Sequence, residues 1–216
     1  MTVAAALALV LTLGVAYGCG SLPWGLWIGR LARGVDIRTV GSGNLGATNV
    51  YRTLGPGLGV LTLLLDIAKG ALPVWLLPQL GWAAAFPGGP EWCRLAAGLA
   101  AVAGHVWTFL AGFKGGKGVA TTVGVLLALA PAAFGVFVAV FGLTVAVTRY
   151  ISLGSTLGAV AFAVSLGLAS PAGPRGPTFL LGLALAALVI VRHRDNFRRL
   201  LRGEERRFSW KGGKRA

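Results

Sequence analysis

Charged residues and cysteine are both rare in this sequence. Charged side chains make up 12% of its 216 residues, whereas hydrophobic residues make up 56%. The two cysteines, Cys19 and Cys93, have no Cys-x-x-Cys spacing and no histidine cluster near them, which argues against a metal site. The sequence also has no long polar block. This composition argues against a soluble domain and predicts an integral membrane protein.

Acidic residues are scarcer still, with six Asp and Glu against 20 Lys and Arg and a formal net charge of +14. Nucleic-acid-binding proteins often carry a charge of this size. Here, however, the cations lie between apolar runs and in a C-terminal tail, where membrane topology alone would place them. We therefore predict no nucleic-acid partner.

Seven apolar segments predict an all-α, polytopic membrane fold with about seven transmembrane helices, and six is the alternative. They cover residues 3–23, 57–78, 92–112, 118–130, 131–148, 152–170 and 178–192. The first has no cationic region before it, so we expect it to be retained as a membrane helix. Only Pro131 separates the short fourth segment from the fifth, so these form either two helices or one kinked helix.

The distribution of the cations predicts the orientation of the chain. With seven helices and the N-terminus outside, 17 of the 20 Lys and Arg lie in the cytoplasm, Arg94 and Arg175 lie outside, and Lys69 lies within a helix. This agrees with the positive-inside rule. We predict a single membrane-embedded domain over residues 1–216, with a basic cytoplasmic tail over residues 192–216.

A glycine-rich polar stretch, FKGGKGVATT, covers residues 113–122. Glycine lets backbone N–H groups point into a concavity, the next helix adds the positive end of its dipole, and Lys114 and Lys117 add two ammonium groups. This pattern predicts an anion site, most naturally for phosphate. It differs from a nucleotide P-loop in its glycine spacing and in having Gly118 where that loop has Ser or Thr. The alternative is a flexible loop that follows the positive-inside rule.

The first cytoplasmic loop, DIRTVGSGNLGATNVYRTLG, covers residues 36–55 and has a similar character. Ser42, Asn44 and Asn49 offer neutral polar groups, and Arg52 offers a fork suited to a phosphate or carboxylate. These residues predict a second segment that favours oxyanions. The alternative is that they are ordinary turn residues beside a membrane-flanking cation.

Three ionisable residues lie inside predicted helices. Asp66 and Lys69 are spaced i, i+3, so they are close enough to pair. A charge at the bilayer centre costs ~2.5 to 3.5 kcal/mol, so we expect the pair to face the bundle interior or to lie near the interface. It either orients the anion site or braces the helices. His105 lies nine residues before Lys114 and is either a brace or a catalytic group.

The third polar segment is RHRDNFRRLLRGEE, residues 192–205. It places His193 and Asn196 on one helical face, and Glu205 follows Gly203, where the helix is expected to end. The alternative is a cationic tail lying on anionic lipid. Together the three polar segments predict a site for an anionic, phosphorylated substrate beside lipid. The residues alone leave transport and group transfer both open.

At these three segments the chain resembles the bacterial acyl-phosphate:glycerol-3-phosphate acyltransferases, and the similarity runs from about Gly20 to Phe208. The second segment of that family appears here as GHVWTFLAGFKGGKGVAT, and its Gly-Ser-x-Pro start appears at Gly20, Ser21 and Pro23. One departure is Thr108, which stands where the family usually has proline and puts a local kink near His105 in question.

The resemblance implies roles for the polar residues of the three segments. The catalytic group contains Ser42, Arg52, His193 and Asn196. The substrate-binding group contains Asn44, Lys114, Gly115, Gly116, Lys117 and Gly118. We assign structural support to Asp66, Lys69, His105 and Glu205.

The resemblance also implies the reaction. Acyl phosphate and glycerol 3-phosphate would be the substrates. The products would be phosphate and lysophosphatidic acid that is acylated at the 1-hydroxyl. This reaction would be the first acylation step of phospholipid synthesis. We expect no cofactor, no metal and no obligatory protein partner, with the protein in the lipid of the bacterial inner membrane and its site on the cytoplasmic side.

Acyl phosphate is already activated, so positioning and electrostatics suffice for catalysis. His193, His105 and a substrate phosphate oxygen remain candidate bases. The rival function is an anion or lysophospholipid transporter, which Asp66, Lys69 and Pro131 favour.

Overall fold

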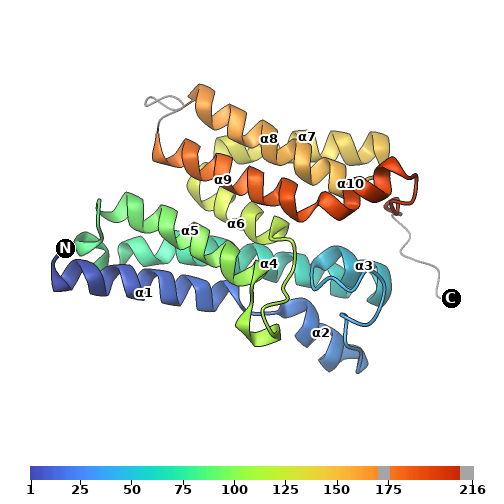
Figure 1. The fold of residues 1–216 in the computed structure, drawn as a ribbon, viewed down its shortest axis with the longest axis horizontal. Helices are drawn as coiled ribbons and strands as arrows, with labels where there is room; N and C mark the ends of the chain where they lie inside the picture. The colour runs from blue at the N-terminus through green and yellow to red at the C-terminus, as the bar shows by residue number, and fades with distance from the viewer. Residues whose placement is uncertain (170–175, 210–216) are drawn as a thin grey trace. The chain divides into compact units, whose positions relative to one another are not determined.

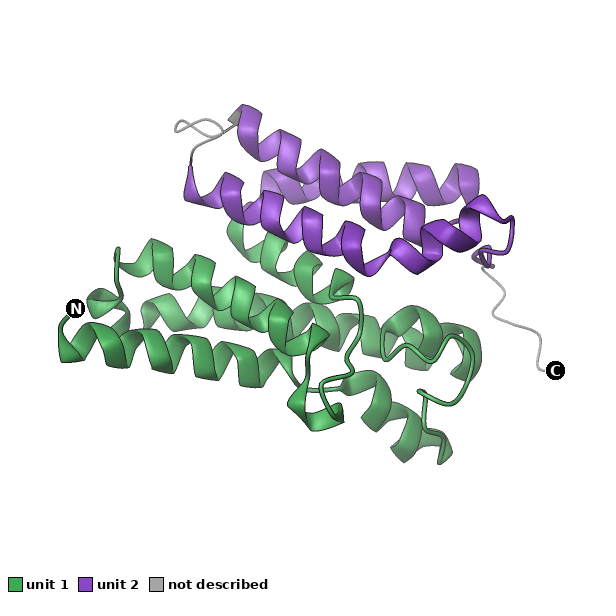
Figure 2. Cartoon of the chain, in the orientation of Figure 1, with its two compact units in different colours: residues 1–129, 211–216 green, residues 130–210 purple. Residues whose placement is uncertain are grey.

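The computed structural model describes residues 1–169 and 176–209. Arg175, the last residue of the predicted segment 152–170 and the end of the basic tail lie outside the described residues. Within the described ranges, regular structure consists of α-helices and short 3-10 helices without a strand, which confirms the all-α prediction. The chain divides into two compact units, shown in Figure 2: residues 1–129, which we call unit 1, and residues 130–209, which we call unit 2.

Unit 1 contains six α-helices and three short 3-10 helices among its residues 1–129, and Figure 1 shows the course of the α-helices. Its elements are α1 Val3–Gly20, α2 Trp24–Arg33, α3 Ala47–Leu54, α4 Pro56–Leu76, η1 Leu77–Gln79, η2 Gly81–Ala85, α5 Pro90–Val106, η3 Phe109–Ala111 and α6 Val119–Leu129. Pro56 and Pro90 occupy the first turns of α4 and α5, where the missing proline N–H costs no hydrogen bond. The main packing pairs are α4 with α6, α1 with α5, and α3 with α4.

Glycine residues let the helices of unit 1 pack backbone to backbone. A Cβ atom on Gly70 of α4 would overlap the carbonyl oxygen of Thr121 in α6, and one on Gly124 of α6 would overlap that of Ile67 in α4. Small residues allow this close approach between helices in lipid, where dispersion contacts replace the hydrophobic effect. The start of α6, which follows the second polar segment, is therefore held tightly against α4.

Unit 2 contains α7 Pro131–Thr148, α8 Ile151–Ala169, α9 Pro177–Arg192 and α10 Arg194–Leu201. α8 packs against both α7 and α9. Arg149 ends α7 in the left-handed conformation, with φ 62°, and its N–H donates to the Val145 carbonyl. α9 and α10 meet at His193 with a bend of 50°. Unit 2 is therefore a three-helix layer with a short polar helix after its last member.

The seven predicted apolar segments correspond to α1, α4, α5, α6, α7, α8 and α9. α6 and α7 are two helices, because Ala130 between them has a non-helical φ of −148° and ψ of 76°. Five helical stretches of the described residues are long and apolar enough to cross a membrane, or six if the bent α9–α10 pair is one span. α6 has only 11 residues, well below the ~20 that a membrane crossing needs.

α5 ends earlier than the sequence predicted, at Val106 instead of residue 112. Trp107 leaves the helical conformation, with φ −120° and ψ 54°. Thr108 is buried, and its hydroxyl donates a hydrogen bond to the Ser21 carbonyl in the connection between α1 and α2. The chain thus leaves the helix just after His105 without a proline at position 108.

The close contact between α4 and α6 makes the protein sensitive to substitution of Gly124. We expect Gly124→Ala to lower the free energy of unfolding by ~1 to 3 kcal/mol, because the added methyl must push the two helices apart. The thermal unfolding midpoint in detergent micelles measures this effect. Gly14→Ala in α1 is the matched control, since nothing lies within 4 Å of a Cβ atom there. Equal midpoints for the two variants would contradict the proposed packing role.

Candidate functional site

The first polar segment is organised around the side chain of Asn49, which is buried in α3. Its carboxamide oxygen accepts a hydrogen bond of 2.8 Å from the Ser42 N–H. Its amide nitrogen donates to the carbonyls of Ile37, Val40 and Asn44, each at 3.1 Å. The sequence predicted that Asn49 offers its polar groups to an anion. In the structure its carboxamide instead forms hydrogen bonds within the loop. Asn49 therefore fixes the backbone on both sides of Ser42.

Ser42 lies on the exposed side of this loop, between Gly41 and Gly43. Both glycines are left-handed, with φ 63° and 67°, a conformation that is strained for residues with a side chain. The Asn44 carboxamide oxygen accepts from the Gly46 N–H at 2.8 Å and so closes a local turn. Arg52 lies in the last turn of α3 and is half-buried. The loop thus presents Ser42 outward on a backbone that Asn49 and Asn44 hold in place.

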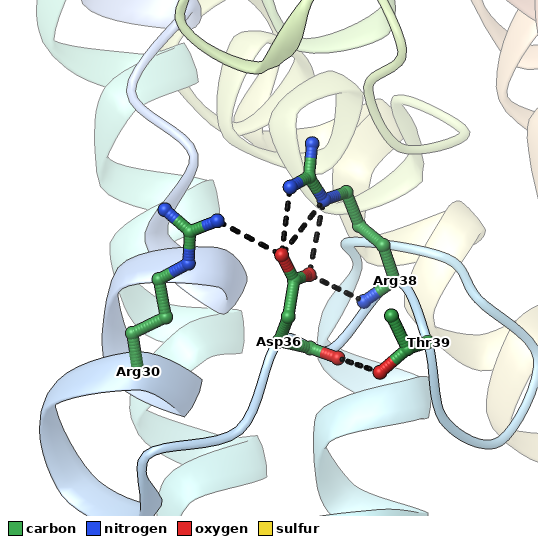
Figure 3. Close-up of polar contacts among 4 residues, drawn as sticks. All are labelled: Arg30, Asp36, Arg38 and Thr39. Atoms are coloured by element: carbon green, nitrogen blue, oxygen red, sulfur yellow. Dashed lines mark hydrogen bonds and ion pairs between the residues drawn. The ribbon is translucent and has the colours of Figure 1, made fainter.

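An ion-pair cluster fixes the start of the first segment (Figure 3). Asp36 accepts hydrogen bonds from Arg38 at 2.7 Å and from Arg30 of α2 at 2.9 Å. The Thr39 hydroxyl donates to the Asp36 carbonyl at 2.9 Å. The hydrogen bonds from Arg38, together with the weaker contribution of Arg30, hold the pKa of the Asp36 carboxyl well below its ordinary range. Asp36 is therefore ionised at neutral pH and ties the segment to the last turn of α2.

The second polar segment folds back onto the C-terminal end of α5. The N–H groups of Gly115 and Gly116 donate to the carbonyls of Val106 and His105, each at 3.1 Å. The prediction that glycine N–H groups point into an anion concavity is therefore wrong for these two residues. They satisfy the carbonyls at the end of α5, which have no partner within the helix.

The rest of this segment turns through left-handed conformations before α6 begins. Gly112 has φ 67°, Phe113 has φ 60° and Gly118 has φ 84°. Lys114 is exposed, and Lys117 is half-buried. Gly118 directly precedes α6, and its carbonyl accepts the Thr122 N–H at 2.7 Å. Lys114 and Lys117 thus directly precede and follow the glycine pair in the sequence, just before the start of a helix, where the dipole also favours an anion.

A buried cluster of three ionisable residues lies at the cavity that Gly116 of the second segment also lines. Lys69 Nζ is 2.8 Å from Asp66 Oδ1, which confirms the predicted i, i+3 pair. His105 Nδ1 lies 3.6 Å from the same carboxylate oxygen. Lys69 also donates a hydrogen bond of 2.6 Å to the Leu22 carbonyl, in the connection between α1 and α2. The three side chains are only 2 to 5% exposed.

This cluster borders a small cavity with room for about one water molecule. The cavity is lined by Pro23, Trp24, Leu45, Asp66, Lys69, His105, Thr108 and Gly116. Leu45 belongs to the first polar segment and Gly116 to the second, so the two segments meet here inside unit 1. Asp66, Lys69 and His105 lie directly below that meeting point.

The third polar segment lies in unit 2. His193 is buried at the junction of α9 and α10, and its Nδ1 is 2.8 Å from the Val189 carbonyl oxygen. A carbonyl oxygen only accepts, so Nδ1 carries the hydrogen and Nε2 has the lone pair in the neutral ring. The Asn196 amide nitrogen donates to Glu205 Oε1. His193 and Asn196 therefore each have one side-chain group fixed by a neighbour within unit 2.

Glu205 joins the end of the third segment to α8 and α10. Its carboxylate accepts hydrogen bonds of 2.9 Å from the Ser152 hydroxyl and from Arg199 Nε, in addition to that from Asn196. Burial raises the pKa of the carboxyl, but the hydrogen bonds from Asn196, Ser152 and Arg199 outweigh burial and hold the pKa below its ordinary value. Glu205 is thus a charged brace between a helix and the chain that follows α10.

The other residues that contact this segment were not selected in the sequence analysis. The Phe208 N–H donates to the Arg149 carbonyl at 2.6 Å. The Arg207 guanidinium lies 5.6 Å from the centre of the Tyr150 ring, and its Nε is 3.4 Å from the Tyr150 hydroxyl oxygen. Together with Ser152, these contacts fasten residues 205–208 to the junction of α7 and α8. No local pattern around positions 149 to 152 signals such a role.

The predicted site residues are divided between the two units. Unit 1 holds Ser42, Asn44, Arg52, Asp66, Lys69, His105, Lys114, Gly115, Gly116, Lys117 and Gly118, and unit 2 holds His193, Asn196 and Glu205. Within unit 1 the cavity joins the first and second segments. The convergence of all three segments stays a prediction. Among the described residues, no group of three or more His, Cys, Asp and Glu is placed to hold a metal ion.

Comparison with known proteins identifies close relatives over nearly the whole chain. Residues 10–203 match the family model described as glycerol-3-phosphate acyltransferase. A protein of that description from Geobacter sulfurreducens is 50% identical over 201 residues, which cover 93% of this chain and 97% of the relative. Another from Trichlorobacter lovleyi is 48% identical over 194 residues, covering 89% and 94%.

Solved structures give the same result. The chain is similar to the crystal structure of PlsY, an integral membrane glycerol 3-phosphate acyltransferase, in its glycerol 3-phosphate form, with a TM-score of 0.83 and 38% identity over 93% of this chain and 96% of that one. For the lysophosphatidic acid form the TM-score is 0.81, with 37% identity over 93% and 95% of the two chains. This chain belongs to the glycerol-3-phosphate acyltransferase family.

Proposed function

We propose that the protein moves a fatty acyl group from acyl phosphate to the 1-hydroxyl of glycerol 3-phosphate, giving lysophosphatidic acid and phosphate as the first acylation of phospholipid synthesis. Family membership supports acyl transfer to glycerol 3-phosphate. The relative solved in both glycerol 3-phosphate and lysophosphatidic acid forms supports this substrate and this product. The observation that carries the proposal is the meeting of the first and second polar segments at one cavity in unit 1.

In this proposal Lys114 and Lys117 bind the phosphate of glycerol 3-phosphate. The two lysines directly precede and follow Gly115–Gly116 in the sequence, close to the start of α6. Two cations and a helix dipole together offset the charge of a phosphate. Gly118 provides the left-handed turn that leads into the helix, with φ 84°. The second segment is then the acceptor half of the site.

The first and third segments bind the acyl phosphate in this proposal. The Arg52 fork matches the geometry of a phosphate, and the exposed Ser42 hydroxyl donates to the phosphate or to the developing oxyanion. Asn44 keeps the turn beside Ser42 closed. We also propose catalytic roles for His193 and Asn196, and the Glu205 carboxylate accepts a hydrogen bond from Asn196 within their segment. The acyl chain lies between helices in lipid.

The proposed reaction is a direct transfer. The 1-hydroxyl oxygen of glycerol 3-phosphate attacks the acyl carbonyl carbon, the bond from that carbon to the phosphate oxygen breaks, and inorganic phosphate leaves with the bonding electron pair. The hydroxyl proton passes to a base. We propose His193 as this base: its Nδ1 hydrogen is directed at the Val189 carbonyl, so the neutral ring carries its lone pair on Nε2. A phosphate oxygen of the substrate is the alternative acceptor.

We propose the following membrane arrangement for this activity. The chain is a single domain with about seven transmembrane helices, its N-terminus outside and its basic tail, residues 192–216, in the cytoplasm. The distribution of Lys and Arg supports this orientation. The site then faces the cytoplasm at the inner membrane of a bacterial cell. There, each phosphorylated substrate is either dissolved in the cytoplasm or carried in the lipid. The protein needs no obligatory protein partner.

Acyl transfer in micelles tests the proposed function directly. We expect purified protein in detergent micelles to convert acyl phosphate and glycerol 3-phosphate to lysophosphatidic acid, detected by mass spectrometry or thin-layer chromatography. A transporter needs a sealed compartment, whereas a transferase does not. Folded protein that yields no lysophosphatidic acid from these substrates would exclude this donor and acceptor pair. Acyl coenzyme A in place of acyl phosphate is the control for the donor.

The assignment of glycerol 3-phosphate to the second segment predicts a selective effect of Lys117→Ala. We expect the KM for glycerol 3-phosphate to rise ~10-fold or more, because a charge-assisted contact contributes ~1.5 to 3 kcal/mol. The KM for acyl phosphate should change little. Steady-state kinetics with each substrate varied in turn measures both values. Arg33→Ala, at the exposed end of α2, is the control. Equal rises of both KM values in Lys117→Ala would contradict the assignment.

The charged brace at Glu205 predicts a pH-dependent contribution to stability. The folded-state pKa of Glu205 lies below its ordinary value of 4.5, so its stabilisation is present above that pH and is lost as the pH falls through the folded-state pKa. We expect Glu205→Gln to lower the free energy of unfolding by ~1 to 3 kcal/mol near neutral pH and to match the unmutated protein in acid.

The thermal unfolding midpoint from pH 7 to pH 3 checks this prediction. Asp195→Asn is the matched control, because Asp195 is an acid on α10 whose side chain is 62% exposed. Its effect should stay within ~0.5 kcal/mol at every pH. A difference between Glu205→Gln and the unmutated protein that does not change with pH would exclude the carboxylate charge as the source of the stabilisation.

A further inference from the structure

The glycine pair of the second segment rests directly on His105. The His105 carbonyl accepts the Gly116 N–H at 3.1 Å, and the next carbonyl, that of Val106, accepts the Gly115 N–H at 3.1 Å. A Cβ atom on Gly116 would overlap His105 Nε2 and lie 2.9 Å from Cε1 and 3.1 Å from Cδ2. His105 therefore contacts the glycine pair through both its backbone and its ring.

The opposite side of the ring faces a buried ion pair. His105 Nδ1 lies 3.6 Å from Asp66 Oδ1, and the same oxygen is 2.8 Å from Lys69 Nζ. Lys69 in turn donates to the Leu22 carbonyl between α1 and α2. A continuous series of contacts thus runs from that connection, through α4, to the ring and the glycine pair. Its members belong to four different parts of unit 1.

Charged side chains at this depth are expensive if packing is their only role. Desolvation of a buried ion pair often cancels its electrostatic attraction, so apolar residues of similar size would hold the helices together as well or better. The pair does have a specific effect on its surroundings: it fixes the position of the His105 ring. The ring in turn limits how closely the second segment can approach α5.

We infer that His105 is a positioning residue for the glycerol phosphate half of the site, with Asp66 and Lys69 holding its ring. This inference rests on the proposed function. Lys114 and Lys117 flank the glycine pair, so a displacement of Gly115–Gly116 moves both ammonium groups. Misplacing a binding group by about 1 Å can lower a rate ~100-fold. His105 thus acts through the loop and does not touch the substrate.

The His105 ring leaves no room for a side chain at position 116, so a second substitution that removes the ring should compensate for alanine there. Gly116 lacks the positive φ of Gly112 and Gly118, so its backbone accepts alanine without strain. The obstacle to alanine there is the ring of His105. At Gly115 the obstacle is backbone, because a Cβ atom would overlap the His105 carbonyl oxygen. Removal of the ring should therefore relieve a substitution at position 116 and leave one at position 115 unrelieved.

The experiment compares the same alanine substitution with and without the ring, in detergent micelles. We expect Gly116→Ala to raise the KM for glycerol 3-phosphate about 10-fold or more, with less than a twofold change for acyl phosphate. His105→Ala alone should raise that KM severalfold. Addition of Gly116→Ala to His105→Ala should then cost less than about twofold. In the matched pair, Gly115→Ala should be as harmful with His105→Ala as without it.

A second histidine variant and a binding measurement complete the test. If His105→Ala does not fold, His105→Asn provides the smaller side chain while keeping a polar group beside Asp66, and the same relief of Gly116→Ala is expected. The rise of the thermal unfolding midpoint on addition of glycerol 3-phosphate reports binding without an acyl donor. The relief should appear in this binding measurement too.

The outcomes separate the inference from the proposed function. Equal costs of Gly116→Ala with and without the ring would overturn the positioning role of His105, as would equal effects on the two substrates. Loss of transfer from acyl phosphate in the unmutated protein, with glycerol 3-phosphate binding retained, would instead reject the proposed donor. The compensation would then still be measurable by binding.

Discussion

The structure of unit 1 depends on the buried ion pair between Asp66 and Lys69. In an apolar helix neither charge is tolerated without partners, so each must be satisfied by groups from elsewhere in the chain. Lys69 reaches the Leu22 carbonyl at 2.6 Å, and Asp66 faces His105 at 3.6 Å. These contacts link α4 to the connection between α1 and α2 and to the end of α5. The glycine pair of the second segment then rests on the histidine that this pair holds.

Each of the three polar segments is held by hydrogen bonds to groups inside its own unit. The Asn49 side chain holds the first segment through four hydrogen bonds to backbone groups. The backbone carbonyls of His105 and Val106 hold the second, and the Glu205 carboxylate holds the third through Ser152, Asn196 and Arg199. A loop held in this way keeps its binding groups in place before the substrate arrives, which reduces the entropy lost on binding.

Much of the fold was predictable because its signals are local. Apolar runs located α1, α4, α5, α6, α7, α8 and α9, and the i, i+3 spacing of Asp66 and Lys69 correctly predicted their pair. Prediction failed where a group had two possible partners. The Gly115 and Gly116 N–H groups were expected to face an anion, but they bind α5 carbonyls that otherwise lack partners. The Asn49 side chain carries groups that could bind a ligand, but it forms hydrogen bonds within its own loop instead.

The apolar helices, the polar segments between them and the family resemblance could be read from the residues alone, because periodicity, composition and motif order are properties of neighbouring residues. The packing of the folded chain places Gly116 on the His105 ring and brings Ser152 to Glu205, 53 positions away. Such contacts depend on how helices pack and where loops return, and no local pattern encodes them. The candidate site residues were therefore named from the sequence, whereas most of the contacts that hold them in place became visible only through the fold.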